Sequence, residues 1–360
     1  MKYFLTIGIA FCFNTVLFCQ INKDSTVLIR AKAQKEFLDA KKEFVNYEKL
    51  HGHFIKTKNV RMHFLTWGDP KGIPLIWVPG TSSNAYELMS FSDYFVKAGY
   101  YIITIDYYGQ GLTPFPDHEV SIYSVADDMK FIMDSLKIGR AVIGGWSRGG
   151  SIATAFYDSY PQNTLGLILE DGGSVAWDVN IDKSEVSAIE NEIVQDYKKQ
   201  VPEPLFDSEF EAYFSRMPPE LPELWFRFFT LSAIKKNKTG KWGFNFGLNE
   251  LVSEDNADQR LKVILRPFAA NLFGASTHQL QPKIIYRNLN VPMMIIDPIN
   301  NNDDYDFQKE NSLLQKSHPD LIEHKIYENT GHAAKWEQAG KFIPDVIAFF
   351  GKVKVFHKIK

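Results

Sequence analysis

The chain has 360 residues, of which 45% are hydrophobic and 23% charged, and its formal net charge is −3. This is an ordinary globular composition, and the length suits one large α/β domain or a domain with an insertion. The near-neutral balance gives no indication of nucleic acid as a partner, because its recognition needs a concentrated basic surface. Aromatic residues make up 14% of the chain, enough to fill a core and to line an apolar pocket.

Residues 1–19 have the layout of a secretory signal peptide. Lys2 precedes an almost wholly apolar run from Tyr3 to Phe18, and polar residues come next. The run is short for a membrane span. We therefore expect an exported protein, periplasmic or extracellular, with no stable membrane span after cleavage; a retained N-terminal anchor is the alternative. Both cysteines, Cys12 and Cys19, lie in this segment, so cleavage after Cys19 would leave no disulfide and no cysteine nucleophile.

Residues 20–50 are rich in lysine and glutamate, with apolar side chains at helical spacing, and predict an exposed helical extension. After two strands around a turn near residue 58, short apolar strands alternate with amphipathic helices. Such alternation indicates a mostly parallel central sheet with helices on both faces. The apolar strands are IPLIWVPG, YYIITIDYYG, RAVIGGWS, LGLILEDGG and VPMMIIDP.

Residues 174–288 interrupt this alternation. They contain helix-like segments, several prolines and aromatic clusters such as LWFRFF. We interpret them as a helical cap inserted into an α/β core that consists of residues 51–173 and 289–360. The chain is therefore expected to be α/β, with one core and one insertion.

The segment GGWSRGG contains the pattern Gly-x-Ser-x-Gly, with Ser147 at its centre. A buried strand precedes it and a helix follows, which is the strand-to-helix context that a nucleophile elbow requires. The flanking glycines leave room in a tight turn, and the helix N-terminus favours developing negative charge. We interpret Ser147 as a nucleophile and not as the serine of a structural Gly-Ser turn.

Four stretches in this order resemble the α/β-hydrolase family: WVPGTSSN, IDYYGQGLT, GGWSRGG and ENTGHAAKWE. The resemblance implies an α/β-hydrolase fold with a Ser–His–acid triad and an oxyanion hole. His332 matches the family's loop histidine after the last strand and would be the base that activates Ser147. The backbone N–H groups of Thr81 and Arg148 match the oxyanion hole, where the loss of one donor costs about 3 kcal/mol.

The chain departs from the family pattern in two loops. Pro79-Gly80 stands where the family usually has His-Gly, a change that leaves a backbone donor intact. Tyr108 replaces the arginine of the usual Asp-x-Arg-Gly-x-Gly, so the bracing of the neighbouring loops is expected to differ.

The acid of the triad is expected in the loop INNNDDYDF. Counting back from the following helix favours Asp304, with Asp303 as the second choice. Asp297, Glu170 and Asp171 lie at strand ends and are more distant alternatives. The loop lacks the central glycine and terminal glutamate of an EF-hand, so no metal site is predicted.

These residues predict a serine hydrolase that cleaves an ester or amide bond of a small, apolar substrate and needs no cofactor. Ser147 would attack the carbonyl, His332 would transfer its proton, and Asp304 would orient the imidazole. Trp146, beside the nucleophile, would wall the acyl pocket. A nucleophilic serine in place of aspartate argues against dehalogenase and epoxide hydrolase chemistry.

Two alternatives remain open from the sequence. A proline-iminopeptidase-like aminopeptidase would use acidic residues of the cap to bind a substrate amine. A non-catalytic member of the fold would only bind a ligand, and would not react with a serine-directed phosphonate.

Overall fold

The computed structural model describes residues 23–178, 181, 184–218, 222–300 and 307–359. Its centre is an eight-stranded sheet in the order β1-β2-β4-β3-β5-β6-β9-β10. β1 pairs antiparallel with β2, and β2 pairs antiparallel with β4; the other neighbours run parallel. The strands are β1 (Gly52–Lys56), β2 (Arg61–Trp67), β3 (Ile73–Val78), β4 (Tyr100–Ile105), β5 (Ala141–Trp146), β6 (Thr164–Glu170), β9 (Met293–Ile299) and β10 (Ile322–Glu328).

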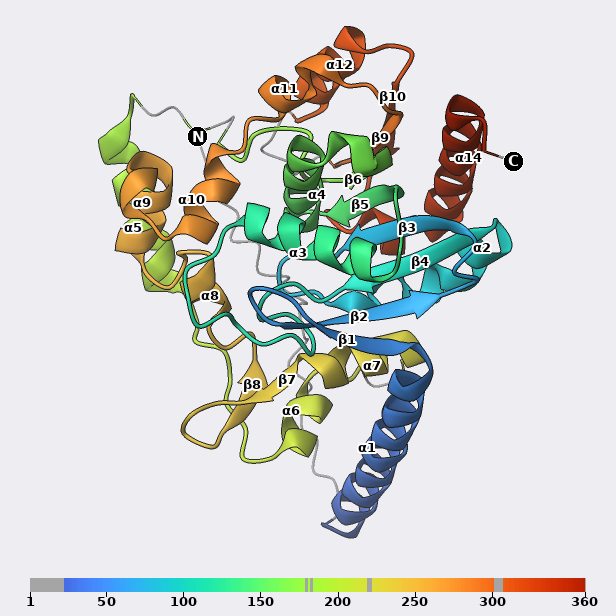
Figure 1. Cartoon of the computed structure of the whole chain (residues 1–360). Coiled ribbons are helices and arrows are strands. Elements are labelled where there is room, and N and C mark those ends of the chain that lie inside the picture. Colours follow the sequence, from blue (N-terminus) through green and yellow to red (C-terminus); the bar gives the residue numbers. More distant parts are fainter. Residues whose placement is uncertain (1–22, 179–180, 182–183, 219–221, 301–306, 360) are drawn as a thin grey trace.

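Helices cover both faces of this sheet (Figure 1). Side chains that alternate along β3 point to opposite faces of the sheet: Ile76 and Val78 join one hydrophobic cluster, and Leu75 and Trp77 join the other. The first cluster takes in α3, α4 and α12, and the second takes in α1, α2 and α14. The helices of the core are α1 (Lys23–His51), α2 (Ser92–Lys97), α3 (Ile122–Ser135), α4 (Arg148–Ser159), α12 (Phe307–Ser317), α13 (Ala334–Glu337) and α14 (Ala339–His357). The predicted mostly parallel α/β sheet is confirmed.

The chain between β6 and β9, residues 171–292, is called the helical insertion below. α5, α9 and α10 gather on one side of the molecule, whereas α6 and α7 lie beside α1, and the hairpin β7–β8 lies against α6 (Figure 1). Its elements are α5 (Val186–Lys199), α6 (Glu209–Ser215), α7 (Leu224–Ala233), β7 (Ile234–Lys236), β8 (Trp242–Phe244), α8 (Leu248–Leu251), α9 (Ala257–Leu265), α10 (Leu272–Gln279) and α11 (Pro282–Ile285). The described residues also form the 3-10 helices η1 (Ala85–Phe91), η2 (Pro161–Asn163), η3 (Pro267–Ala269) and η4 (Tyr286–Asn288).

The N-terminal helix α1 is not wholly exposed, in contrast to the expectation from its composition. Ala33, Phe37 and Ala40 are buried, and the Phe37 ring lies 5.7 Å from that of Phe210 in α6. None of the described helices combines the length and apolar character that crossing a membrane requires. The signal peptide expected at residues 1–19 lies outside the described residues.

Candidate active site

Ser147 occupies the sharp turn between β5 and α4. Its backbone has φ 55° and ψ −123°, a conformation that is costly for a residue with a side chain and that is typical of functional turns. The turn needs its glycines, since a Cβ at Gly149 would lie 2.1 Å from the carbonyl oxygen of Val78. The backbone N–H of Ser147 donates to the carbonyl of Glu170 at 2.8 Å, which ties the turn to the end of β6.

His332 lies in the loop between β10 and α13, and Trp146 holds this loop beside the nucleophile turn. The indole Nε1 of Trp146 donates to the carbonyl oxygen of His332 at 2.7 Å, and the two ring centroids are 5.0 Å apart. The His332 Nε2 atom is buried and has no hydrogen-bond partner among the described residues. Trp146 was predicted to wall an acyl pocket; its described contacts are with the protein, and that role stays a prediction.

Asp171 is the carboxylate that contacts His332. Its Oδ2 lies 2.5 Å from His332 Nδ1. Asp171 directly follows β6, has φ 45° and donates its backbone N–H to the carbonyl of Ile296 at 2.9 Å. From the sequence, Asp171 is only a distant alternative for the acid. The preferred residues, Asp304 and Asp303, lie outside the described residues.

The carboxylate of Asp171 changes the acidity of His332. Burial lowers the pKa of His332, but the charge of Asp171 and its hydrogen bond raise that pKa by more, so that the net shift is upward. Asp171 therefore stabilises the protonated, imidazolium form of His332. This is the property that a proton-accepting base needs during nucleophilic attack.

The two loops predicted to form an oxyanion hole meet at Trp146. Arg148 is the first residue of α4, so its N–H has no acceptor within the helix. Thr81 follows Gly80, where an added Cβ would lie 2.5 Å from Cε3 of Trp146. Gly80 also donates its N–H to the Glu87 carboxylate at 3.2 Å. One indole therefore fixes both loops, and the oxyanion role of Thr81 and Arg148 stays a prediction.

The loop in which Tyr108 replaces an arginine is braced in another way. The Asp106 carboxylate accepts hydrogen bonds from the N–H groups of Ala85 at 2.6 Å and Leu112 at 2.8 Å. The Tyr108 hydroxyl donates to the Asp128 carboxylate of α3 at 2.9 Å. A tyrosine–aspartate pair thus anchors the loop in which the family pattern usually has an arginine.

Behind the site lies a fully buried ionic cluster that the sequence analysis missed. The Lys335 ammonium is 3.2 Å from Glu87 Oε1 and 3.2 Å from Glu170 Oε2, and it lies 3.7 Å from the ring centroid of Trp146. The side chains of Lys335 and of both glutamates are 0% exposed. Burial raises the pKa of Glu170, and although the Lys335 charge opposes this, the pKa stands at about 7.

Two further histidines, His63 and His324, form hydrogen bonds with carboxylates that support the fold. His63 contacts Asp106 at 2.7 Å and Glu48 of α1 at 3.1 Å, which joins α1 to the sheet. His324 contacts Asp297 at 2.6 Å, so the imidazole next to Asp297 is His324 and not His332. In the part of the chain that the structure describes, no group of three His, Cys, Asp or Glu side chains could hold a metal ion.

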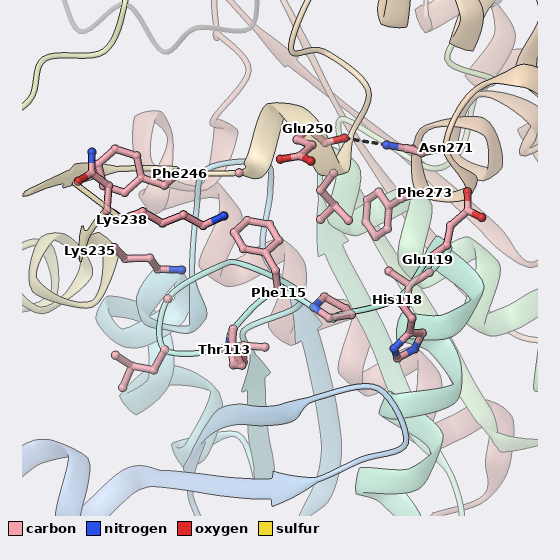
Figure 2. Close-up of a pocket in the computed structure, with 18 of the residues that line it drawn as sticks. Thr113, Phe115, His118, Glu119, Lys235, Lys238, Phe246, Glu250, Asn271 and Phe273 are labelled. Carbon is pink, nitrogen blue, oxygen red and sulfur yellow. Dashed lines mark hydrogen bonds between the residues drawn. The ribbon is translucent and has the colours of Figure 1, made fainter. Parts of the chain in front are cut away.

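A cavity of about 880 Å³ lies between residues 111–120 and the helical insertion. Figure 2 shows its aromatic walls, Phe115 and Phe273, and the amines of Lys235 and Lys238 directed toward Phe115. None of the three candidate catalytic side chains lines it. The Phe273 ring stacks 6.3 Å from that of Tyr107, which places the cavity behind the loop that follows β4.

Comparisons with known proteins agree with this architecture. A profile described as alpha/beta hydrolase fold matches residues 73–339. An uncharacterized protein of Mycobacterium bovis is 36% identical over 80 residues, which cover 22% of this chain and 24% of that protein. Epoxide hydrolase 4 of Mus musculus is 26% identical over 191 residues, or 50% of this chain and 46% of that protein. The chain therefore spans less than half the length of these two relatives.

Among solved structures, the thioesterase domain from the curacin biosynthetic pathway superimposes with a TM-score of 0.56 at 16% identity. The superposition covers 82% of this chain and 98% of that domain, and at this identity it bears on the fold alone. Since the family profile matches well over half of the sequence, the chain belongs to the alpha/beta hydrolase fold family.

Proposed function

We propose that the protein is a serine hydrolase that cleaves an ester or amide bond of a small organic molecule through an acyl-enzyme. The observation that carries the proposal is the pairing of His332 with Asp171 at 2.5 Å, next to a serine held in a strained strand-to-helix turn. A serine hydroxyl is a weak nucleophile unless a positioned base accepts its proton. The unpartnered Nε2 of His332 is the atom available for this role.

In the first half-reaction, Ser147 Oγ attacks the substrate carbonyl while His332 Nε2 accepts the hydroxyl proton. The tetrahedral oxyanion is bound by the N–H groups of Thr81 and Arg148. The intermediate collapses, the leaving group departs with the proton from His332, and the acyl group stays on Ser147. Water then repeats the same steps and releases the acid. Asp171 holds the imidazole and stabilises its charged form.

Esters and amides fit a serine better than epoxides do. The mouse relative is named an epoxide hydrolase, but attack of a serine hydroxyl on an epoxide would give an ether, which water does not readily cleave. Attack on a carbonyl gives an ester, which water does cleave. The presence of Ser147 as the nucleophile therefore favours acyl transfer.

Side chains near the candidate site also bear on the substrate. Trp225 of the helical insertion stacks 5.3 Å from Trp336, and Trp336 packs 5.5 Å from Trp146. These rings support an apolar wall next to His332. The charged side chain that follows the nucleophile is Arg148, a cation that would repel the amine of an aminopeptidase substrate. We therefore favour an esterase over a proline-iminopeptidase-like enzyme.

The test is mass spectrometry of the purified protein after treatment with a fluorophosphonate. We expect one adduct on Ser147 in the wild type, none in Ser147→Ala, and strongly slowed labelling in His332→Ala. A folded wild-type protein that forms no adduct would contradict the mechanism and favour a member of the fold that only binds a ligand.

We also propose that the protein is exported and that residues 1–19 are removed. The support is the sequence pattern of the N-terminus alone. The intact mass of the protein from the producing cell, together with fractionation, tests this: the full-length mass in the cytoplasmic fraction would contradict it.

A further inference from the structure

Arg148 carries a buried cation directly beside the nucleophile. The residue is 3% exposed, and its guanidinium carbon lies 5.2 Å from the ring centroid of Trp177. Burial raises the pKa of Tyr107, and the charge of the nearby Arg148 guanidinium opposes this shift. The Tyr107 hydroxyl in turn lies 3.5 Å from the carbonyl oxygen of Gly80, so the cation belongs to the neighbourhood of the oxyanion loop.

The acid that contacts Arg148 does not form a hydrogen bond with it. Its Nη2 is 3.6 Å from Glu254 Oε1, beyond the length of a hydrogen bond. The same oxygen of Glu254 also pairs with Nη1 of Arg260. Two guanidinium groups thus approach the same oxygen of Glu254, and the contact of Arg148 is the longer of the two.

The Nε atom of Arg148 is buried and has no hydrogen-bond partner among the described residues. Leaving a buried donor on a charged group unpaired is costly. Guanidinium groups match carboxylates, because two parallel N–H donors face two oxygens. An anion that reaches Arg148 would satisfy the free Nε donor.

We propose that Arg148 binds a carboxylate of the substrate, so that the preferred substrates are esters of a dicarboxylic acid with one carboxylate left free. This inference rests on the proposed function. Arg148 would act twice: its backbone N–H on the oxyanion, and its side chain on the carboxylate. An extended arginine places its guanidinium about 6 Å from its own backbone nitrogen, which suits a carboxylate about two to four methylenes from the scissile carbonyl. On the acyl side the carboxylate would stay in contact through both half-reactions.

The experiment compares 4-nitrophenyl hemisuccinate, hemiglutarate and hemiadipate with 4-nitrophenyl pentanoate, in which a methyl group replaces the carboxylate of hemiglutarate. In the wild type we expect kcat/KM to be at least about 10-fold higher for the best hemiester than for the pentanoate. Arg148→Met should reduce this preference about 10- to 100-fold. Arg148→Lys keeps the charge but not the planar pair of donors, and should fall between the two.

The control variant is Arg216→Met. Arg216 belongs to the helical insertion and, like Arg148, contacts one glutamate and one aromatic ring: it lies 3.1 Å from Glu203 and 4.5 Å from the ring of Phe244. We expect it to leave the hemiester preference unchanged. A wild-type enzyme that hydrolyses the pentanoate as well as every hemiester would overturn the inference, as would an equal loss of preference in Arg216→Met.

A second measurement needs no variant. Glutarate should slow fluorophosphonate labelling of Ser147 in the wild type, whereas 1-pentanol at the same concentration should not. Labelling that is insensitive to glutarate would refute carboxylate binding while leaving the proposed serine hydrolase intact. Absence of any labelling of folded protein would refute the proposed function, and the inference with it.

Discussion

Replacing Lys335 with methionine removes the cation from a cluster that holds two buried carboxylates. Each contact, at 3.2 Å, corresponds to about 5 kcal/mol of Coulomb attraction at an effective dielectric constant of about 20. Desolvation cancels much of this, and removing one partner of a buried ion pair typically costs about 3–5 kcal/mol. With an unfolding entropy of about 2 cal/mol/K per residue, a loss of that size lowers Tm by about 4–7 °C.

The pH dependence gives this prediction a second test. Burial raises the pKa of Glu170 to about 7 even with Lys335 present, so without the ammonium the carboxyl should bind its proton more tightly still. A raised carboxyl pKa costs stability as pH rises above the unfolded value. The loss caused by Lys335→Met should therefore be larger at pH 8 than at pH 5.

Calorimetry at both pH values measures the effect, and two further variants control it. Adding Glu170→Gln to Lys335→Met should restore part of the stability, because one buried charge is removed. Lys341→Met is the matched exposed case: its ammonium lies 4.1 Å from the ring of Tyr327, and its loss should cost at most about 0.5 kcal/mol. A Tm for Lys335→Met within 1 °C of the wild type at pH 8, where roughly 4–7 °C is expected, would refute the reasoning.

Three further predictions concern the site and its support. Asp171→Asn should lower kcat on the order of 10³–10⁴-fold and move the acid limb of the kcat/KM profile to lower pH, because the carboxylate that raises the imidazole pKa is lost. Asp304→Asn should change kcat little, because His332 already has Asp171 as its carboxylate partner, and the reverse ranking would place the acid in residues 301–306. Burial lowers the pKa of His63, but hydrogen bonds to two carboxylates raise it to about 9. The stabilisation from His63 is therefore full below about pH 6.5 and is lost as the pH rises through about 9. His63→Gln should remove this pH dependence of Tm between pH 6 and 10, and a variant whose Tm changes with pH in parallel with the wild type would contradict it. Gly80→Ala would bring a Cβ to 2.5 Å from Trp146 and should lower kcat by about 10²–10³, whereas an unchanged kcat would separate this loop from oxyanion binding.

The fold and the strand-to-helix turn at Ser147 were predictable because their signals are local. Ser147 is recognisable from seven residues between a buried strand and a helix, and the parallel sheet from strands that are apolar along their whole length. The contacts of Lys335 were not predictable. A lysine at the start of a short helix is normally exposed, and only the tertiary structure places it between acids from η1 and β6.

For the acid, counting along one loop and the described contacts favour different residues. The search for the acid followed the loop after β9, whereas the imidazole of His332 is bonded to Asp171 after β6. Which carboxylate reaches the imidazole depends on strand order, and β6 lies between β5 and β9 in the sheet. The available signal was that LGLILED ends in an acid directly after the strand that follows the nucleophile along the chain.

The position of Asp171 also determines which of the candidate residues must be held in place by tertiary contacts. Ser147 and Asp171 directly follow the neighbouring strands β5 and β6, and the N–H of Ser147 donates to the carbonyl of Glu170, so the proposed nucleophile and the proposed acid are joined through the sheet. His332 comes from a distant part of the chain and must be held against that unit. Trp146 does this through the carbonyl of His332, and Lys335, three residues further on, does it through Glu170. Loosening either contact should therefore misplace the base relative to the serine, which lowers kcat while leaving substrate binding nearly intact.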